Sequence, residues 1–187
     1  MFTDRHEFLD RIKDSYTAYY NINEPEDVGA EGLPLVFRAD FFSRGEKYWI
    51  TKSAKMWANE INEYLYVFSD ENFDTETVNK CMDFAIDQTV SLAKPHKEHQ
   101  YTNALCVFVS DSIDKDALKA LKKRSFSKSY NHSFWGYTLL KTLHVNYKTE
   151  KMHTNRAGHD LDQFYKQLFK AEAKKQRKLA QAQKQLK

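Results

Sequence analysis

Glycine and proline are scarce in this sequence, and their scarcity limits the folds that the chain can adopt. Five glycines and three prolines stand among 187 residues, whereas average usage would give about 12 per cent for the two together. Tight turns and chain breaks depend largely on these two residue types. A turn-dense β-sandwich, a propeller and a collagen-like chain are therefore disfavoured, and long helices and long strands are expected.

Apolar residues recur at helical spacing in four segments, which predicts four helices. The apolar stripes lie within residues 4–20, 74–92, 114–121 and 161–169. Asp74 or Thr75 can cap the second helix, and Pro95 prevents its continuation. Each stripe gives its helix one face that can pack against the rest of the domain.

Five segments have the pattern of β-strands, which are residues 35–42, 48–51, 64–68, 104–109 and 135–147. The first two are expected to form a hairpin, because residues 43–46 include a glycine that suits a reversal. Residues 21–32 are predicted to be a loop. The order α-β-β-β-α-β-α-β-α predicts one α+β domain over residues 1–169, with a mixed, mainly antiparallel five-stranded sheet flanked by helices.

The formal net charge of +3 is unevenly distributed along the chain. Residues 170–187 carry +6, so residues 1–169 carry −3. We therefore expect a basic C-terminal helical extension or flexible tail after a slightly acidic domain. Such a tail predicts an anionic partner, either nucleic acid or an acidic protein, that is attracted by the tail rather than by the whole domain.

The sequence favours a cytoplasmic protein without a membrane span. The first residues lack the apolar region of a secretory signal, and the longest apolar run, residues 104–109, is far shorter than a bilayer requires. Cys81 and Cys106 lie in apolar periodic segments and have no C-x-x-C spacing. They are expected to be structural thiols in a reducing compartment.

Two short motifs carry a resemblance to a known family. They are Lys94-Pro95-His96-Lys97-Glu98-His99 and Thr154-Asn155-Arg156-Ala157-Gly158, and they occur with an aromatic N-terminal helix and with Asn62-Glu63-Tyr64. Over residues 5–169 the chain resembles an uncharacterised bacterial family from clostridia and related Gram-positive bacteria. The resemblance implies a bacterial origin and a single domain, and it transfers no catalytic residue because that family has no assigned activity.

The element order is similar to the core of metal-dependent nucleases of the PD-(D/E)xK type. That chemistry needs an acid on one strand and an acid-x-lysine on the next. Asp40 and Glu63 are the strand candidates, but Phe42 and Leu65 stand where the lysine is required. A metal-dependent phosphodiesterase or nuclease-like hydrolase with a degenerate or non-obvious site therefore stays the alternative interpretation, and its catalytic residues are unknown.

The pair His96 and His99 is the other candidate for metal binding. Their i, i+3 spacing could aim both rings at one point, where Glu98 or His132 would complete a zinc site. The competing interpretation is that both are solvated loop histidines, because lysines flank the pair. No motif for an organic cofactor is present, so no cofactor is expected.

Candidate anion-binding residues occur in two separate segments. Asn155, Arg156 and Gly158 precede the last helix, where free backbone N–H groups and an arginine fork can receive a phosphate or carboxylate. Alternatively, Asn155 and Gly158 form a turn and Arg156 pairs with an acid. The second segment holds Lys122, Lys123 and Arg124 beside hydroxyl and aromatic residues, or it is a solvated helix end.

These features favour a non-enzymatic binding or accessory module that engages an anionic partner. The domain supplies a surface around Arg156, and the tail after residue 169 supplies positive charge. The alternative is the hydrolase, whose site would contain Asp40 and Glu63.

Overall fold

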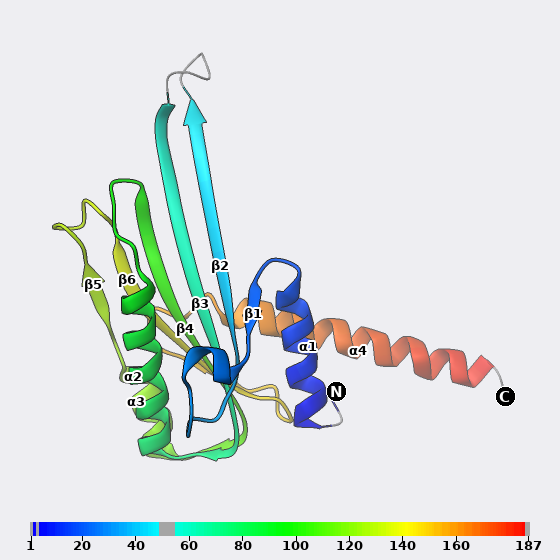
Figure 1. Cartoon of the computed structure of the whole chain (residues 1–187). Helices are drawn as coiled ribbons and strands as arrows, with labels where there is room; N and C mark the ends of the chain where they lie inside the picture. The colour runs from blue at the N-terminus through cyan, green and yellow to red at the C-terminus, as the bar shows by residue number, and fades with distance from the viewer. Residues whose placement is uncertain (1, 3, 49–54, 186–187) are drawn as a thin grey trace.

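The computed structural model describes residue 2 and residues 4–48 and 55–185. It shows a mixed α+β domain with four α-helices and one sheet (Figure 1). In chain order the elements are α1 (Arg5–Thr17), β1 (Asn21–Asn23), the 3-10 helix η1 (Pro25–Val28), β2 (Leu35–Tyr48), β3 (Lys55–Phe73), α2 (Thr75–Leu92), β4 (His99–Ile113), α3 (Lys115–Lys123), β5 (Ser127–Ser129), β6 (Tyr137–Asn146), β7 (Met152–Thr154) and α4 (Asp162–Gln185).

The sheet is mixed, as predicted, but it has seven strands in the described residues instead of five. The strand order is β1-β2-β3-β4-β6-β5, and β7 also pairs with β6. The pairs β3–β4 and β4–β6 are parallel and the other pairs are antiparallel. The prediction missed β1, β5 and β7 because three residues are too few for a period of two to appear in the sequence.

The predicted hairpin with a turn at residues 43–46 is wrong. Strand β2 continues through these residues to Tyr48, and Gly45 pairs with Asn59 of β3. Gly45 has no positive φ angle, so its backbone serves as ordinary strand there. Of the predicted strand 48–51, Tyr48 is the end of β2 and residues 49–51 lie outside the described residues.

Side chains alternate along the strands and create a core on each face of the sheet. On one face, called the α1/α4 face, Phe37, Leu65 and Val107 pack with buried residues of α1 and α4. On the other, called the α2/α3 face, Tyr66 and Phe108 pack with buried residues of α2 and α3. The long central strands therefore need helices on both sides, which explains the near-continuous apolar runs in β3 and β4.

Both cysteines are free thiols buried on the α2/α3 face. Burial raises the pKa of the Cys81 thiol to about 12 and raises that of Cys106 well above its usual range. A thiol that stays protonated behaves as a small apolar side chain and is a poor nucleophile.

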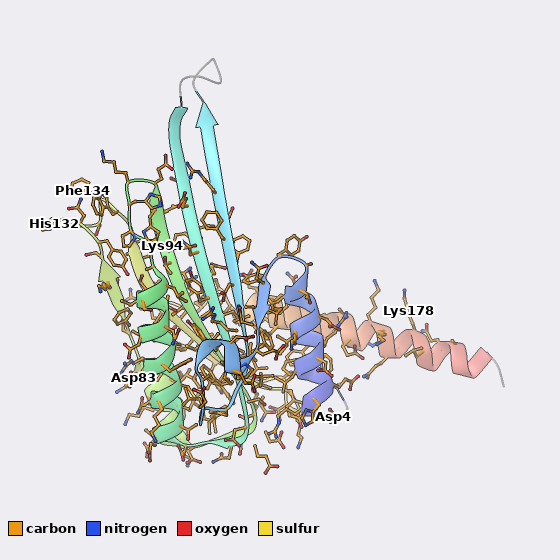
Figure 2. The ribbon with its side chains drawn as sticks, viewed as in Figure 1. Asp4, Asp83, Lys94, His132, Phe134 and Lys178 are labelled. Atoms are coloured by element: carbon orange, nitrogen blue, oxygen red, sulfur yellow. The ribbon has the colours of Figure 1, made fainter. Side chains whose placement is uncertain are left out.

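Helix α4 packs on the domain at its beginning and then leaves it (Figure 1). Tyr165, Leu168 and Phe169 are buried, and Glu172 is the last buried residue in the described part of this helix. Leu179 is 54 % exposed, and Figure 2 shows Lys178 on the half that extends away from the sheet. Among the described residues, no helix is both long and apolar enough to cross a membrane.

Candidate anion-binding site

The site is built at a gap in the edge of the sheet. Strand β5 pairs with residues 137–139 of β6, and β7 pairs with residues 143–145. No described strand covers residues 140–142 on that side of β6. Residues 155–158 follow β7 and lie against this gap before the chain reaches α4 on the α1/α4 face.

Asn155 fills the gap with its side chain. It is 3 % exposed, and its Oδ1 accepts hydrogen bonds from the backbone N–H of Thr142 at 3.1 Å and of Gly158 at 2.8 Å. Its Nδ2 donates to the carbonyl oxygens of Arg124 at 2.9 Å and Leu140 at 3.2 Å. One amide group thus joins β6, the following turn and the end of α3.

Position 158 requires a glycine because its backbone lies close to the edge of the sheet. A Cβ atom there would lie 2.7 Å from the carbonyl oxygen of Thr142 and 2.9 Å from Oδ1 of Asn155. Since real Cβ contacts are longer, any other residue would push the turn away from β6. The predicted turn roles of Asn155 and Gly158 therefore match their observed hydrogen bonds.

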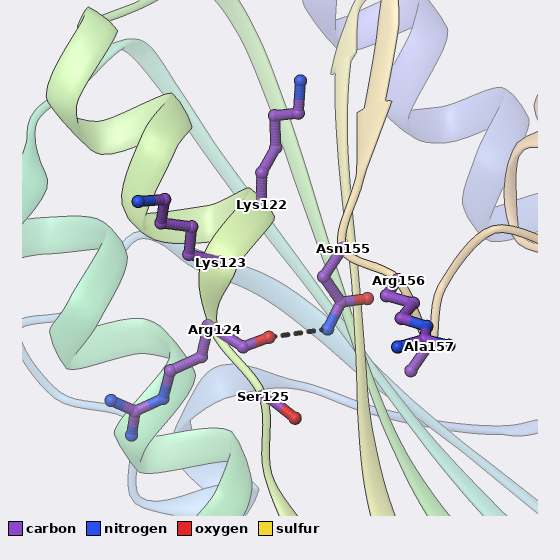
Figure 3. Close-up of a pocket in the computed structure, with 7 residues that line it drawn as sticks. All are labelled: Lys122, Lys123, Arg124, Ser125, Asn155, Arg156 and Ala157. Carbon is purple, nitrogen blue, oxygen red and sulfur yellow. Dashed lines mark hydrogen bonds between the residues drawn. The ribbon is translucent and has the colours of Figure 1, made fainter.

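An open hollow of about 530 Å³ lies between the end of α3 and this turn (Figure 3). Its lining residues come from both segments that the sequence singled out, and they are Lys122, Lys123, Arg124, Ser125, Asn155, Arg156 and Ala157. In Figure 3, Lys122 and Lys123 extend from the last turn of α3, and Arg156 lies on the opposite side. We name this feature the basic hollow.

Three of the lining cations have no acidic partner in the part of the chain that the structure describes. Lys122, Lys123 and Arg156 are exposed, and no ion pair or side-chain hydrogen bond joins them to another described residue. Arg124 differs, because its guanidinium pairs with Asp83 of α2 and points away from Arg156 in Figure 3. The lining of the basic hollow therefore includes three cations without a described acidic partner, and in Figure 3 the ammonium group of Lys123 points away from Arg156.

The positive charge of Lys122 acts on a neighbouring side chain, that of His153. Burial, followed by the charges of Lys122 and Lys151, lowers the pKa of His153 in β7. Burial disfavours the protonated imidazole, and the nearby lysine charges add to this effect.

Asp40 and Glu63, the acids of the hydrolase interpretation, point to opposite faces of the sheet. Asp40 accepts two hydrogen bonds from the Arg38 guanidinium at 2.7 and 2.8 Å. Glu63 accepts from the Tyr20 hydroxyl at 2.9 Å and from Nδ2 of Asn103 at 3.2 Å. The two carboxylates cannot hold one metal ion in this arrangement.

His96 and His99 are each held by other protein groups. Nε2 of His96 lies 2.7 Å from Oε2 of Glu60. Nδ1 of His99 donates to the Trp135 carbonyl at 2.6 Å, and its Nε2 then accepts from the Thr102 hydroxyl at 2.8 Å. No group of three or more His, Cys, Asp or Glu side chains in the described residues is arranged to hold a metal ion.

Sequence reasoning missed a second hollow of about 440 Å³ on the α1/α4 face. Its lining residues are Tyr101, Asn103, Tyr137, Leu139, Lys141, Ala157, His159 and Asp160. The sequence pattern of β4 indicates this hollow, because the residues on this face are the apolar Leu105 and Val107 at one end and the more polar Tyr101 and Asn103 at the other. We name this feature the tyrosine hollow.

A model of a protein family, described as a domain of unknown function (DUF8052), matches residues 4–167. No curated protein and no solved structure matches the chain. The matched residues run from the cap of α1 to the packed part of α4 and include both hollows. They agree closely with the residues over which the sequence resembles an uncharacterised family.

Proposed function

The chain belongs to the DUF8052 family of domains of unknown function, and we propose that it is a non-enzymatic binding module for an anionic partner. The basic hollow receives a phosphate or carboxylate of that partner. The free buried thiols Cys81 and Cys106 support a reducing location such as the cytoplasm, and the sequence resemblance supports a bacterial source.

One observation carries this proposal, which is that Lys122, Lys123 and Arg156 line a single hollow. Like charges that gather without a described acidic neighbour repel one another, and a bound anion would relieve that repulsion. The arginine can grip two oxygens of one group through its planar fork, while the lysines act as mobile point charges. Such a set suits a phosphate best, because it carries more charge than a single carboxylate.

The exposed part of α4 supplies a second cationic surface. Lys170, Lys174, Lys175, Arg177 and Lys178 are all exposed. Residues 170–187 carry +6 against −3 for the rest of the chain. This distribution supports an extended polyanion, a nucleic acid or an acidic protein, as the partner.

The positions of Asp40 and Glu63 on opposite faces favour binding over metal-dependent phosphodiester hydrolysis. Each of these carboxylates already accepts hydrogen bonds from protein side chains. Neither is placed beside the basic hollow's lining residues.

The test is binding of inorganic polyphosphate by calorimetry at about 50 mM and about 200 mM salt. We expect the variant K122A/K123A/R156A to bind at least about tenfold more weakly at the lower salt concentration, with a shallower salt dependence, because each lost phosphate contact removes about 0.7 to 0.9 from the log–log slope.

The matched control is K13A/K80A/K166A, which removes the same charge from lysines that pair with acids elsewhere on the surface. It should bind polyphosphate nearly as the wild type does. If the control loses as much affinity as the hollow variant, attraction is by overall charge and the proposed site is wrong.

A further inference from the structure

The tyrosine hollow adjoins the basic hollow. Ala157 lines both of them, because residues 155–158 cross the edge of the sheet between its two faces. The cations lie on one side of this turn, and the uncovered ends of β4 and β6 lie on the other. A single extended ligand can therefore reach both hollows.

Two stacked tyrosines line the tyrosine hollow. Tyr101 of β4 and Tyr137 of β6 are register partners, and their rings stack with centroids 6.1 Å apart and planes 27° apart. Tyr137 is 38 % exposed and Tyr101 is half-buried. Because the two rings stack on each other, a further planar ring can extend the stack on the more exposed ring of Tyr137, and the pair is then a platform for that ring.

Polar groups surround this platform. Asn103 lines the hollow and donates to Glu63, which also accepts from the Tyr20 hydroxyl. Lys141 pairs with Asp160 at 2.6 Å on the side nearest the turn. Carboxylate and amide oxygens of this kind can accept from the exocyclic amino group of a base, whereas they repel a phosphate.

This inference rests on the proposed function and gives its partner a chemical class. We infer that the anionic partner is single-stranded nucleic acid, with a base that extends the stack of Tyr101 and Tyr137 and backbone phosphates against Lys122, Lys123 and Arg156. An acidic protein offers carboxylates but few planar rings, so it leaves the platform unused. A duplex offers phosphates but keeps its bases paired and stacked, so the single strand fits both hollows best.

The test measures fluorescence anisotropy of a labelled oligonucleotide of about 12 nucleotides, which is within the range of single-strand sites on one domain. The same sequence is tested as DNA, as RNA and with abasic sugars in place of nucleotides. We expect Y101L/Y137L to bind the intact DNA or RNA strand about tenfold or more weakly. Its affinity for the abasic strand and its salt slope should stay at the wild-type values.

The matched control is Y101F/Y137F, which keeps both rings and should bind as the wild type does. Circular dichroism shows whether the leucine variant is folded. If it is not, the single variant Tyr137→Leu, at the more exposed of the two rings, takes its place.

The outcomes separate this inference from the proposed function. If the leucine variant binds the intact strand normally while K122A/K123A/R156A binds it weakly, stacking is wrong and anion binding stands. If neither variant changes binding, both are wrong. Equal or tighter binding of a polyglutamate peptide or of duplex DNA would also overturn the single-strand inference.

Discussion

Replacing Asn155 with alanine should destabilise the fold strongly. The change removes four hydrogen bonds of 2.8 to 3.2 Å at a side chain that is 3 % exposed. It leaves the N–H group of Thr142 without its partner, whereas the N–H group of Gly158 still donates to the backbone carbonyl of residue 155 at 3.2 Å. A buried group that loses its partner costs about 1 to 3 kcal/mol, and the N–H group of Thr142 dominates because a carbonyl has a second lone pair. We expect a loss of about 2 kcal/mol in the free energy of unfolding.

The assay is urea unfolding followed by tryptophan fluorescence, supported by thermal melts. For a chain of this size, about 2 kcal/mol corresponds to a fall in Tm of roughly 4 to 8 °C. Arg156→Ala is the control, since the exposed neighbouring side chain should change stability by less than about 0.5 kcal/mol. A loss below about 1 kcal/mol in Asn155→Ala would refute the view that this amide group holds the site together.

Three further predictions concern the tail, a buried histidine and a glycine. Deleting residues 177–187, which follow Glu172, the last buried position among the described residues, should leave Tm unchanged in a thermal melt and weaken polyphosphate binding. Burial lowers the pKa of His144 to about 4. Between pH 6.5 and pH 4 the unfolded chain therefore binds a proton that the folded one does not. Urea unfolding should show up to about 3 kcal/mol of stability lost as the pH falls through this range, and less in His144→Gln. Gly158→Ala should cost about 1 to 3 kcal/mol, whereas Gly45→Ala, with nothing within 4 Å of its Cβ position, should be tolerated in the same assay.

The helices and the two-sided sheet follow from local patterns in the sequence. Helix α2 begins at Thr75 after its Asp74 cap and ends at Leu92, before the predicted break at Pro95. Such elements can be predicted because apolar spacing and capping involve residues close together in the chain. The scarcity of glycine and proline likewise agrees with a 19-residue strand and a 24-residue helix.

The predicted turn at residues 43–46 failed because a glycine permits a reversal without requiring one. Pairing of β2 with β3 along its whole length stabilises the extended backbone through Gly45. The short strands β5 and β7 could not be predicted either, since each exists only through hydrogen bonds to β6. Strand pairing of this kind is decided by distant residues.

By itself the sequence supplied the candidate anion-binding residues, Lys122, Lys123 and Arg156 among them, and determined that positive charge is concentrated after residue 169. Only the tertiary structure decided that the end of α3 and residues 155–157 line one hollow, and that Tyr101 and Tyr137 form a platform beside it. The structure also placed Asp40 and Glu63 on opposite faces of the sheet. The positions of these side chains relative to one another depend on the register of the sheet and on the buried hydrogen bonds of Asn155. Both act between residues that are far apart in the chain, so local sequence patterns do not specify them.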